Sequence, residues 1–257
     1  MYNIDLSDKT ALVFGVANQR SIAHHIARLL HQAGANIVLA YQNDRVRNNV
    51  EKAASELGDA TLVECDVSDD TNVEKAFAEI KKKAKTIDVV IHSIAFANRE
   101  DLGGDFAETP REGFRLALDI SAYSLIPITK YAKPLMQDGG SIMTMTFQAS
   151  ERVFPGYNVM GTAKAALEHE VRQLAFELGP ENIRVNALSA GPLDTLSSRV
   201  ISGYIDMKTA HREKSPLQRN ITHEEVAKTA LYLASDLSSG VTGEILHVDT
   251  GYHIIGF

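Results

Sequence analysis

The sequence has no tryptophan, and Cys65 is its one cysteine among 257 residues. A single cysteine excludes an internal disulfide and fits a reducing compartment. Cys65 lies in a mostly apolar stretch without a clear Cys/His/Asn grouping, so we interpret it as a buried structural thiol. There is no run of 18 or more apolar residues, so no membrane span is predicted. The N-terminus lacks the features of a signal peptide, and we expect a cytoplasmic protein.

Positive charge is also scarce. Lys and Arg number 26 against 33 Asp and Glu, which gives a net charge of −7. Because phosphate backbones require a basic surface, nucleic acid is not an expected partner. The nine histidines are scattered, and neither H-E-x-x-H nor C-x-x-C occurs. The sequence therefore predicts no metal site.

Short apolar runs alternate with longer helical patterns along most of the chain. The runs predict strands at 10–16, 36–41, 60–65, 88–92, 140–146, 182–188 and 244–248. The helical patterns lie at 21–33, 44–57, 69–85, 114–136, 157–178 and 223–234. Strands rich in Val, Ile and Leu on both faces indicate a parallel sheet that is covered on both sides. We therefore expect an α/β fold, with residues 1–257 forming a single-domain, Rossmann-like, doubly wound parallel sheet with helices on both faces.

The first candidate site follows the first strand, because ligands of such sheets bind at the carboxyl ends of the strands. Gly15 would allow the backbone to approach a dinucleotide, while Ser21 and the amides of Ser21 and Ile22 could face its pyrophosphate. One glycine does not make G-x-G-x-x-G. A βα turn with a serine cap explains these residues equally well.

The second strand ends at Gln42 and the third at Asp66. Gln42 can hydrogen-bond a ribose diol but repels a 2′-phosphate only weakly, so electrostatics alone does not choose between cofactors. Arg45 and Arg47 could assist a phosphate or simply cover a helix surface. Asp66 could accept a hydrogen bond from an adenine amino group, or it could be an ordinary acid at a helix N-terminus.

A phenol and a cation stand seven positions apart at Tyr157 and Lys164. If the chain is helical from Gly156 onward, the two side chains are nearly eclipsed and about 10 Å apart along the axis. One helix face would then present both groups to one extended cofactor. Taken alone, the spacing favours the simpler interpretation of an amphipathic helix that carries one Tyr and one Lys by chance.

Residues 193–214 predict a long loop with at most a short helix. The stretch is apolar for a loop, and long loops in compact domains are usually functional. We expect a lid over an apolar substrate at about 193–214. The alternative is a segment that merely docks on the core.

Taken together, the motifs resemble those of the short-chain dehydrogenase/reductase superfamily. The strongest similarity is to the enoyl-[acyl-carrier-protein] reductases of bacterial type II fatty-acid synthesis. The resemblance covers nearly the whole chain and rests on Gly15-x5-Ser21-Ile22, the runs at 41–44, 92–97, 119–124, 157–161, 184–192 and 240–244, and Asp66-Val67. Tyr-x6-Lys is the most discriminating motif. Carbonyl-reducing members use Tyr-x3-Lys, which would require a lysine at Gly161.

The resemblance implies that the trans-2 double bond of an enoyl thioester is reduced by hydride from NADH, with NADPH as the second candidate cofactor. Tyr157 would donate a hydrogen bond to the developing enolate oxygen, and Lys164 would hold the nicotinamide ribose. The reduction of the enoyl thioester is the last step of the fatty-acid elongation cycle. The alternatives are another short-chain reductase with a different substrate and a catalytically impaired nucleotide-binding regulator.

The resemblance also implies the remaining site residues. The cofactor would contact Gly15, Ser21, Ile22, Gln42, Asp66, Val67, Ile94, Lys164, Leu193, Asp194, Thr195, Leu196 and Ser197. The substrate would contact Ala97, Phe147 and Tyr157. Phe147 stands where many members have a second tyrosine, so it can only shape the pocket.

Two partners are implied as well. The substrate would arrive on an acyl-carrier protein. The family lid often carries basic residues, whereas the stretch at 202–206 has none and Asp206 has the opposite charge. Asp194 also replaces a base that is common beside the nicotinamide loop. A homotetramer is expected, with the helices at 114–136 and 157–178 as its interface.

Overall fold

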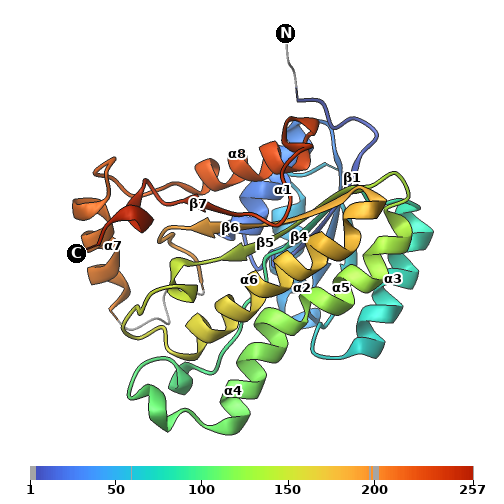
Figure 1. Ribbon diagram of the computed structural model, residues 1–257. Helices are drawn as coiled ribbons and strands as arrows, with labels where there is room; N and C mark the ends of the chain where they lie inside the picture. The colour runs from blue at the N-terminus through green and yellow to red at the C-terminus, as the bar shows by residue number, and fades with distance from the viewer. Residues whose placement is uncertain (1–3, 59, 197, 199–202, 257) are drawn as a thin grey trace.

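Seven parallel strands form one sheet in the order β3-β2-β1-β4-β5-β6-β7 (Figure 1). The computed structural model describes residues 4–58, 60–196, 198 and 203–256. The strands are β1 (Thr10–Phe14), β2 (Asn36–Tyr41), β3 (Thr61–Glu64), β4 (Val89–His92), β5 (Gly140–Thr146), β6 (Ile183–Ala190) and β7 (Ile245–Val248). Each predicted strand is present, and the predicted Rossmann-like doubly wound sheet is confirmed.

Helices cover both faces of the sheet (Figure 1). One face carries α1 (Ile22–Gln32), α2 (Asp44–Ala54) and α8 (His223–Ala234), and the other carries α3 (Asp70–Ala84), α5 (Leu125–Ala132) and α6 (Val159–Leu178). Two more helices, α4 (Arg111–Leu118) and α7 (Tyr204–Lys214), lie toward one end of the strands. No helix in the described part of the chain has the length and apolar character to cross a membrane.

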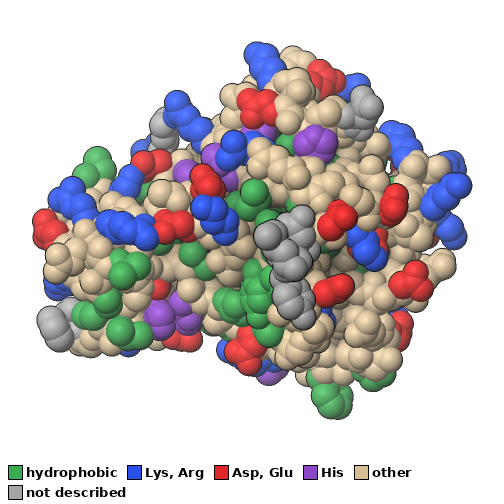
Figure 2. Space-filling model, turned by 90° about the horizontal axis from the view of Figure 1, so that it is seen from above, with side chains coloured by type: hydrophobic (Ala, Val, Ile, Leu, Met, Phe, Trp, Pro, Cys, Tyr) green, Lys and Arg blue, Asp and Glu red, His purple; other side chains and the backbone are tan. Residues whose placement is uncertain are grey.

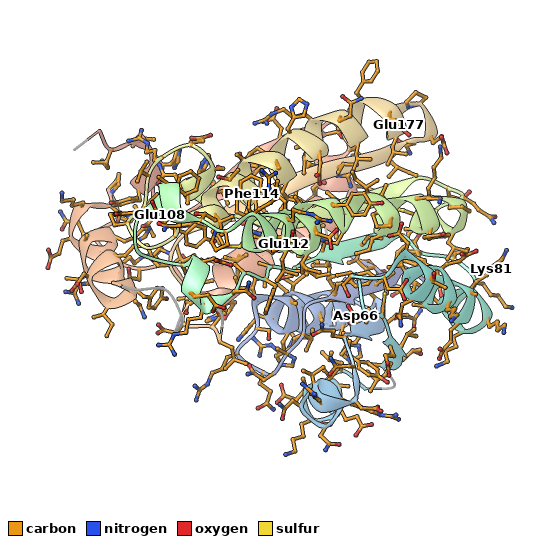
Figure 3. All side chains as sticks on the ribbon, turned by 90° about the horizontal axis from the view of Figure 1, so that it is seen from below. Asp66, Lys81, Glu108, Glu112, Phe114 and Glu177 are labelled. Atoms are coloured by element: carbon orange, nitrogen blue, oxygen red, sulfur yellow. The ribbon has the colours of Figure 1, made fainter. Side chains whose placement is uncertain are left out.

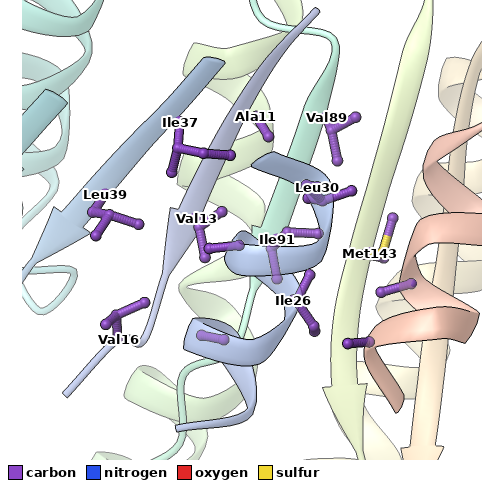
Figure 4. Packing of buried hydrophobic residues seen from close by; sticks show 14 of the residues in the cluster. Ala11, Val13, Val16, Ile26, Leu30, Ile37, Leu39, Val89, Ile91 and Met143 are labelled. Atoms are coloured by element: carbon purple, nitrogen blue, oxygen red, sulfur yellow. The ribbon is translucent and has the colours of Figure 1, made fainter. Parts of the chain in front are cut away.

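The alternation of side chains along each strand divides the core into two layers. Figure 4 shows the α1 layer, where Val13 of β1 and Ile91 of β4 lie near Ile26 and Leu30 of α1. The neighbouring Leu12 points to the other face and joins the layer under the second set of helices. Because both layers are buried, the strands read as continuous apolar runs rather than as alternating ones.

The predicted helix at 114–136 lies within a helical stretch from Arg111 to Leu135, but a π turn, which was not predicted, interrupts its α-helical hydrogen bonding. A π turn at Asp119–Tyr123 separates α4 from α5, and the amide of Ser124 donates to the carbonyl of Asp119 at 3.1 Å. Pro127 explains the break, since it has no N–H to give to the carbonyl four residues earlier and its ring clashes with that carbonyl. Single π turns inside helices occur mostly at functional sites.

Part of the predicted lid is regular, because Tyr204–Lys214 forms α7, an eleven-residue helix. Its last turn carries Arg212 and Lys214, whose positive charge suits a helix C-terminus. The segment before it lies partly outside the described residues.

Cys65 follows β3 and is 4% exposed. Burial raises the pKa of its thiol to about 12. The thiol therefore stays protonated at neutral pH, as expected of a structural cysteine.

Gly15 generates a prediction about stability. Its φ is +92°, and a Cβ at this position would lie 1.9 Å from the carbonyl oxygen of Ser93. Gly15→Ala should therefore lower the free energy of unfolding by about 3–5 kcal/mol, as measured by urea denaturation. Gly240 has open space at its Cβ position, so Gly240→Ala should change the free energy of unfolding by less than about 0.5 kcal/mol. Equal stability of the two variants would contradict the steric argument.

Candidate active site

The loops that follow the parallel strands meet at one edge of the sheet, because all strands point the same way. The strand order reverses between β1 and β4. From β1 the chain continues outward to β2 on one side, and from β4 it continues outward to β5 on the other side. A doubly wound sheet opens a crevice at this point. Most of the predicted site residues lie in these loops or at the start of the helices that follow them.

The loop after β1 is braced by its own side chains. Ser21 Oγ accepts hydrogen bonds from the amides of Ala17 at 3.0 Å and Asn18 at 3.2 Å. Ser21 occupies the N-cap position of α1, as the alternative interpretation predicts, but its side chain makes no cap bond to the helix. Neither bond uses the hydroxyl hydrogen of Ser21. The hydroxyl of Ser21 can therefore still donate. It lies at the N-terminus of α1, beside the half-buried Ile22, where an anion would bind.

The ends of β2 and β3 bring Gln42 and Asp66 together. Gln42 Nε2 lies 3.5 Å from Asp66 Oδ2, the long limit of a hydrogen bond. Asp66 Oδ1 accepts from the amide and the hydroxyl of Ser68 at 3.1 and 2.8 Å. Figure 3 labels Asp66 on the side of the molecule away from α6, while Val67 beside it is buried. An amide and a carboxylate thus share this corner of the crevice.

Tyr157 lies before α6 rather than on it, so the predicted helix start is wrong. The amide of Tyr157 donates to Phe154 at 3.1 Å, which closes a turn with Gly156 at φ +82°. A second turn follows, because the amide of Met160 donates to Tyr157 at 3.0 Å. Asn158 occupies its first central position with φ +36° and ψ −120°. That conformation is typical of glycine in type II′ turns, and for another residue it costs about 1–3 kcal/mol.

The two turns direct the Tyr157 ring into an aromatic pocket. Its ring centroid lies 5.1 Å from that of Phe147 in an edge-on arrangement, and Phe147 in turn lies 4.7 Å from Phe154. Burial raises the pKa of the Tyr157 phenol well above its usual range. Tyr157 is therefore a neutral hydrogen-bond donor at physiological pH.

Lys164 is a buried cation on α6, with 4% exposure. Its Nζ donates to the carbonyl of Met145 at the end of β5, at 2.8 Å. Burial lowers the pKa of Lys164 to about 8, and the carboxylate of Glu168 acts in the opposite direction. Glu168 is itself buried and accepts a hydrogen bond from Thr146 Oγ1 at 2.6 Å. The ammonium is thus fixed in direction by a strand carbonyl.

A buried histidine lies next to this group. His92 Nδ1 is 2.8 Å from Thr144 Oγ1, and Nε2 is 2.8 Å from Ser124 Oγ. Because the Ser124 hydroxyl donates to the carbonyl of Ile120, Nε2 of a neutral ring donates to Ser124 Oγ. The Thr144 hydroxyl has two acceptors within reach, His92 Nδ1 at 2.8 Å and the His92 carbonyl at 3.1 Å, and in the neutral ring Nδ1 is free to accept from it. Burial and the charge of Lys164 lower the pKa of His92 to about 3. The ring is therefore neutral, and Lys164 is not opposed by a second buried cation.

The loop after β4 forms the opposite wall of the site. Ile94 is half-buried, and Ala97 packs against a cluster that contains Met160 and Tyr157. Figure 3 shows Phe114 of α4, which belongs to the same cluster. The Ser121 hydroxyl in the π turn accepts from the amide of Phe96 at 2.9 Å and lies 3.0 Å from its carbonyl.

The loop after β6 carries the remaining predicted cofactor residues. Leu193 is buried, Leu196 is exposed, and Thr195 is held by reciprocal bonds with Ser198. Asp194 forms an ion pair with Lys208 of α7, which lowers the pKa of the carboxyl. Ser197 lies outside the described residues. Asp194 is therefore already engaged by α7.

Three residues near this site were not predicted as functional. Asn158, Ser121 and His92 each place a polar group beside a predicted site residue. Asn158 follows Tyr157 directly, but its partners lie more than 50 residues away, so no local pattern indicates them. Within the described ranges, no group of three His, Cys, Asp or Glu side chains could hold a metal ion.

Comparison with known proteins identifies the family. Residues 15–253 match the family model described as Enoyl-(Acyl carrier protein) reductase. The chain belongs to the enoyl-[acyl-carrier-protein] reductase family. This confirms the resemblance drawn from the Tyr-x6-Lys motif and makes the chain a member of a family of oxidoreductases.

Relatives in this family align over almost their full lengths. The chain is 49% identical to Enoyl-[acyl-carrier-protein] reductase [NADH] FabI of Nostoc sp., covering 98% of this chain and 99% of the relative. It is 50% identical, with the same coverage, to Enoyl-[acyl-carrier-protein] reductase [NADPH] FabI of Staphylococcus aureus. A crystal structure of the Bacillus cereus enoyl-acyl carrier protein reductase with NADP+ and indole naphthyridinone superposes with a TM-score of 0.96 at 48% identity, covering 98% of this chain and all of that one.

The neutral His92 generates a prediction about acid stability. The unfolded chain binds a proton at this ring near pH 6.5, whereas the folded chain does so only near pH 3. Between these values the unfolded state holds more protons, so stability falls as pH falls, by up to about 1.4 kcal/mol per pH unit. From pH 7 to pH 5, the contribution of His92 is a loss of about 2 kcal/mol.

Urea unfolding between pH 7 and pH 5 measures this contribution. His92→Asn should show a shallower loss of stability than the unmodified chain, because asparagine does not titrate. The matched control is His169→Asn at an exposed position of α6, which should keep the original slope. Parallel slopes for His92→Asn and the unmodified chain would show that His92 is not the group responsible.

Proposed function

We propose that the chain reduces the trans-2 double bond of enoyl thioesters carried by acyl-carrier protein, with NADH as the reductant, in the last step of the elongation cycle. The observation that carries the proposal is the pair of neutral Tyr157 and buried cationic Lys164. Both lie at the edge of the sheet where the predicted cofactor residues also lie. The family match supports the same reaction.

The crevice has groups suited to a dinucleotide. The close approach of Gly15 to Ser93 keeps the loops after β1 and β4 together beside the start of α1. Gln42 and Asp66 supply an amide and a carboxylate for the adenosine half, while Lys164 supplies a buried cation for sugar hydroxyls. When bound, NADH supplies the hydride that adds to C3 of the enoyl thioester.

Tyr157 acts on the substrate oxygen. As C3 gains the hydride, negative charge develops on the thioester oxygen, and a neutral phenol can donate a hydrogen bond to it. The aromatic rings of Phe147 and Phe154 exclude water from one side of the phenol, which strengthens this interaction. A donor aimed at developing charge contributes about 3–4 kcal/mol to the transition state.

Lys164 acts by orientation. Its bond to the Met145 carbonyl directs the ammonium, which leaves two N–H groups for the ribose hydroxyls of the reductant. Holding the sugar fixes the hydride donor over the substrate. Phe147 has no hydroxyl, so Tyr157 is the proposed donor to the thioester oxygen.

NADH is the proposed cofactor, and NADPH is the second candidate. Gln42 stands at the β2 end without a positive charge, and Arg47 is paired with Glu51 at 2.9 Å and lies 3.8 Å from Asp44. These carboxylates compete with a 2′-phosphate for the guanidinium. The neighbouring Arg45 keeps NADPH open, and the relatives' names include both cofactors.

We also propose that an acyl-carrier protein binds at α7 and that the protein is cytoplasmic. Residues 1–257 would form a single catalytic domain with a lid at about 193–214. The chain would assemble as a homotetramer. Tyr123, Ile126 and Phe176 are exposed apolar side chains near or on α5 and α6 and would supply part of a subunit interface. Light scattering measures the oligomeric state, and a monomer in solution would contradict the tetramer.

The decisive assay follows the absorbance of the reduced nicotinamide with a trans-2-enoyl thioester, with NADH and NADPH in parallel. Oxidation of NADH is the expected result. Oxidation with a ketone but not with an enoyl thioester would indicate a carbonyl reductase. Cofactor binding without turnover of either substrate would indicate a regulator.

Tyr157 and Lys164 should respond differently to substitution. Tyr157→Phe should lower kcat by about 100-fold while the Kd of NADH, measured by fluorescence titration, stays within about twofold. Lys164→Ala should raise the Kd of NADH by about tenfold or more. Equal effects on kcat and Kd in Tyr157→Phe, or an unchanged Kd in Lys164→Ala, would contradict the assigned roles.

The proposed carrier surface has its own test. Figure 2 shows Lys and Arg side chains at the left, over α7, where Arg212 is exposed beside the groove that Lys208 also lines. Arg212→Glu should raise KM for the acyl-carrier-protein thioester by about fivefold, because opposite charges steer association. KM for the uncharged N-acetylcysteamine thioester should not change. Lys81→Glu on α3 is the matched control, and an equal effect of both variants would refute the surface.

A further inference from the structure

Asn158 joins two parts of the site that are far apart in sequence. Its Nδ2 donates to the carbonyl of Gly103 at 2.7 Å and lies 3.3 Å from that of Gly104. Its backbone occupies the corner between Tyr157 and α6 with φ +36°. A strained conformation persists only where surrounding contacts hold it. The two carbonyls supply such contacts for Asn158.

The other side of this link is a turn at Gly103 and Gly104. Gly103 and Gly104 both have positive φ, and a Cβ at either would have nothing within 4 Å. They belong to the loop after β4, which carries Ala97 at the proposed substrate wall. Ser121 holds the beginning of the same loop at Phe96. Asn158 therefore contacts the same loop a second time, at Gly103 and Gly104.

We propose that Asn158 is a positioning residue that ties the direction of the Tyr157 hydroxyl to the loop at 96–104. The side chain is short and its two bonds are made directly from the corner that sets the Tyr157 backbone. A displacement of the loop is thus transmitted to the phenol. The inference rests on the proposed role of Tyr157 and adds a second group that acts through it.

Two variants separate the side-chain contact from the backbone strain. Asn158→Gly accepts the positive φ and removes both bonds, while Asn158→Asp keeps the size but puts a carboxylate against the two carbonyls. Both should lower kcat with an enoyl thioester by about tenfold or more, since a small misplacement of a catalytic group is enough for such a loss. The Kd of NADH should stay within about twofold.

The matched control is Asn182→Gly. Asn182 also has a positive φ, of +57°, but it precedes β6 at the amino edge of the sheet, away from the site. This variant should keep the original kcat. If Asn182→Gly lowers kcat as much as Asn158→Gly does, the effect comes from the backbone in general and the inference fails.

A double-mutant cycle shows whether Asn158 acts through Tyr157. In the Tyr157→Phe background, Asn158→Gly should lower kcat by less than about twofold, because the hydroxyl that it directs is already absent. An undiminished tenfold loss in that background would overturn the inference, because it would mean that Asn158 supports the fold rather than the phenol.

A second readout does not depend on turnover. With 3-fluorotyrosine at all eight tyrosines, Tyr157→Phe identifies the 19F resonance of Tyr157. Asn158→Gly should move this resonance, and Asn182→Gly should leave it in place. An unmoved resonance in Asn158→Gly would overturn the inference even if the enzyme is active. If the unmodified chain does not reduce enoyl thioesters, the proposed function fails and the resonance still decides whether Asn158 positions the ring.

Discussion

The parallel hydrogen-bonding ladder is the constraint on which the site depends. Parallel strands must be joined by crossovers that cover the faces of the sheet, so a crossover follows each strand from β1 to β6 and the carboxyl ends all open at the same edge. The loops after β1, β4 and β5 are thereby brought together although they are separated by up to 130 positions in the chain. Gly15 permits a close approach of the loops after β1 and β4, since no side chain at this position fits against Ser93.

The electrostatics of the site follow from burial. A single ammonium, Lys164, is placed against a strand carbonyl with Glu168 nearby, while the phenol of Tyr157 and the imidazole of His92 are both kept neutral. Lowering the pKa of one group and raising that of another is the arrangement by which a protein assigns different proton roles to neighbouring side chains. Here the result is one buried cation and one neutral donor, which fits the proposed roles of Lys164 in orientation and of Tyr157 at the developing charge.

The sequence predicts the sheet well because buried parallel strands are unbroken apolar runs, and it predicts α8 fully because Thr222 and Glu225 form a capping box at its start. The break near Pro127 and the late start of α6 could have been inferred from local proline and glycine. The hydrogen bond from Asn158 to Gly103 could not have been inferred from the sequence, since it depends on tertiary packing alone. Motif residues gave the family, which comparison confirms, while their individual roles stay predictions.

The buried thiol of Cys65 has a practical consequence for experiments on this protein. With a pKa of about 12 and no other cysteine in the chain, the native surface offers no reactive thiolate to alkylating reagents. A cysteine introduced on α7 would then be modified alone. A dye or spin label attached there would report the motion of that helix without any need to remove native sulfur first.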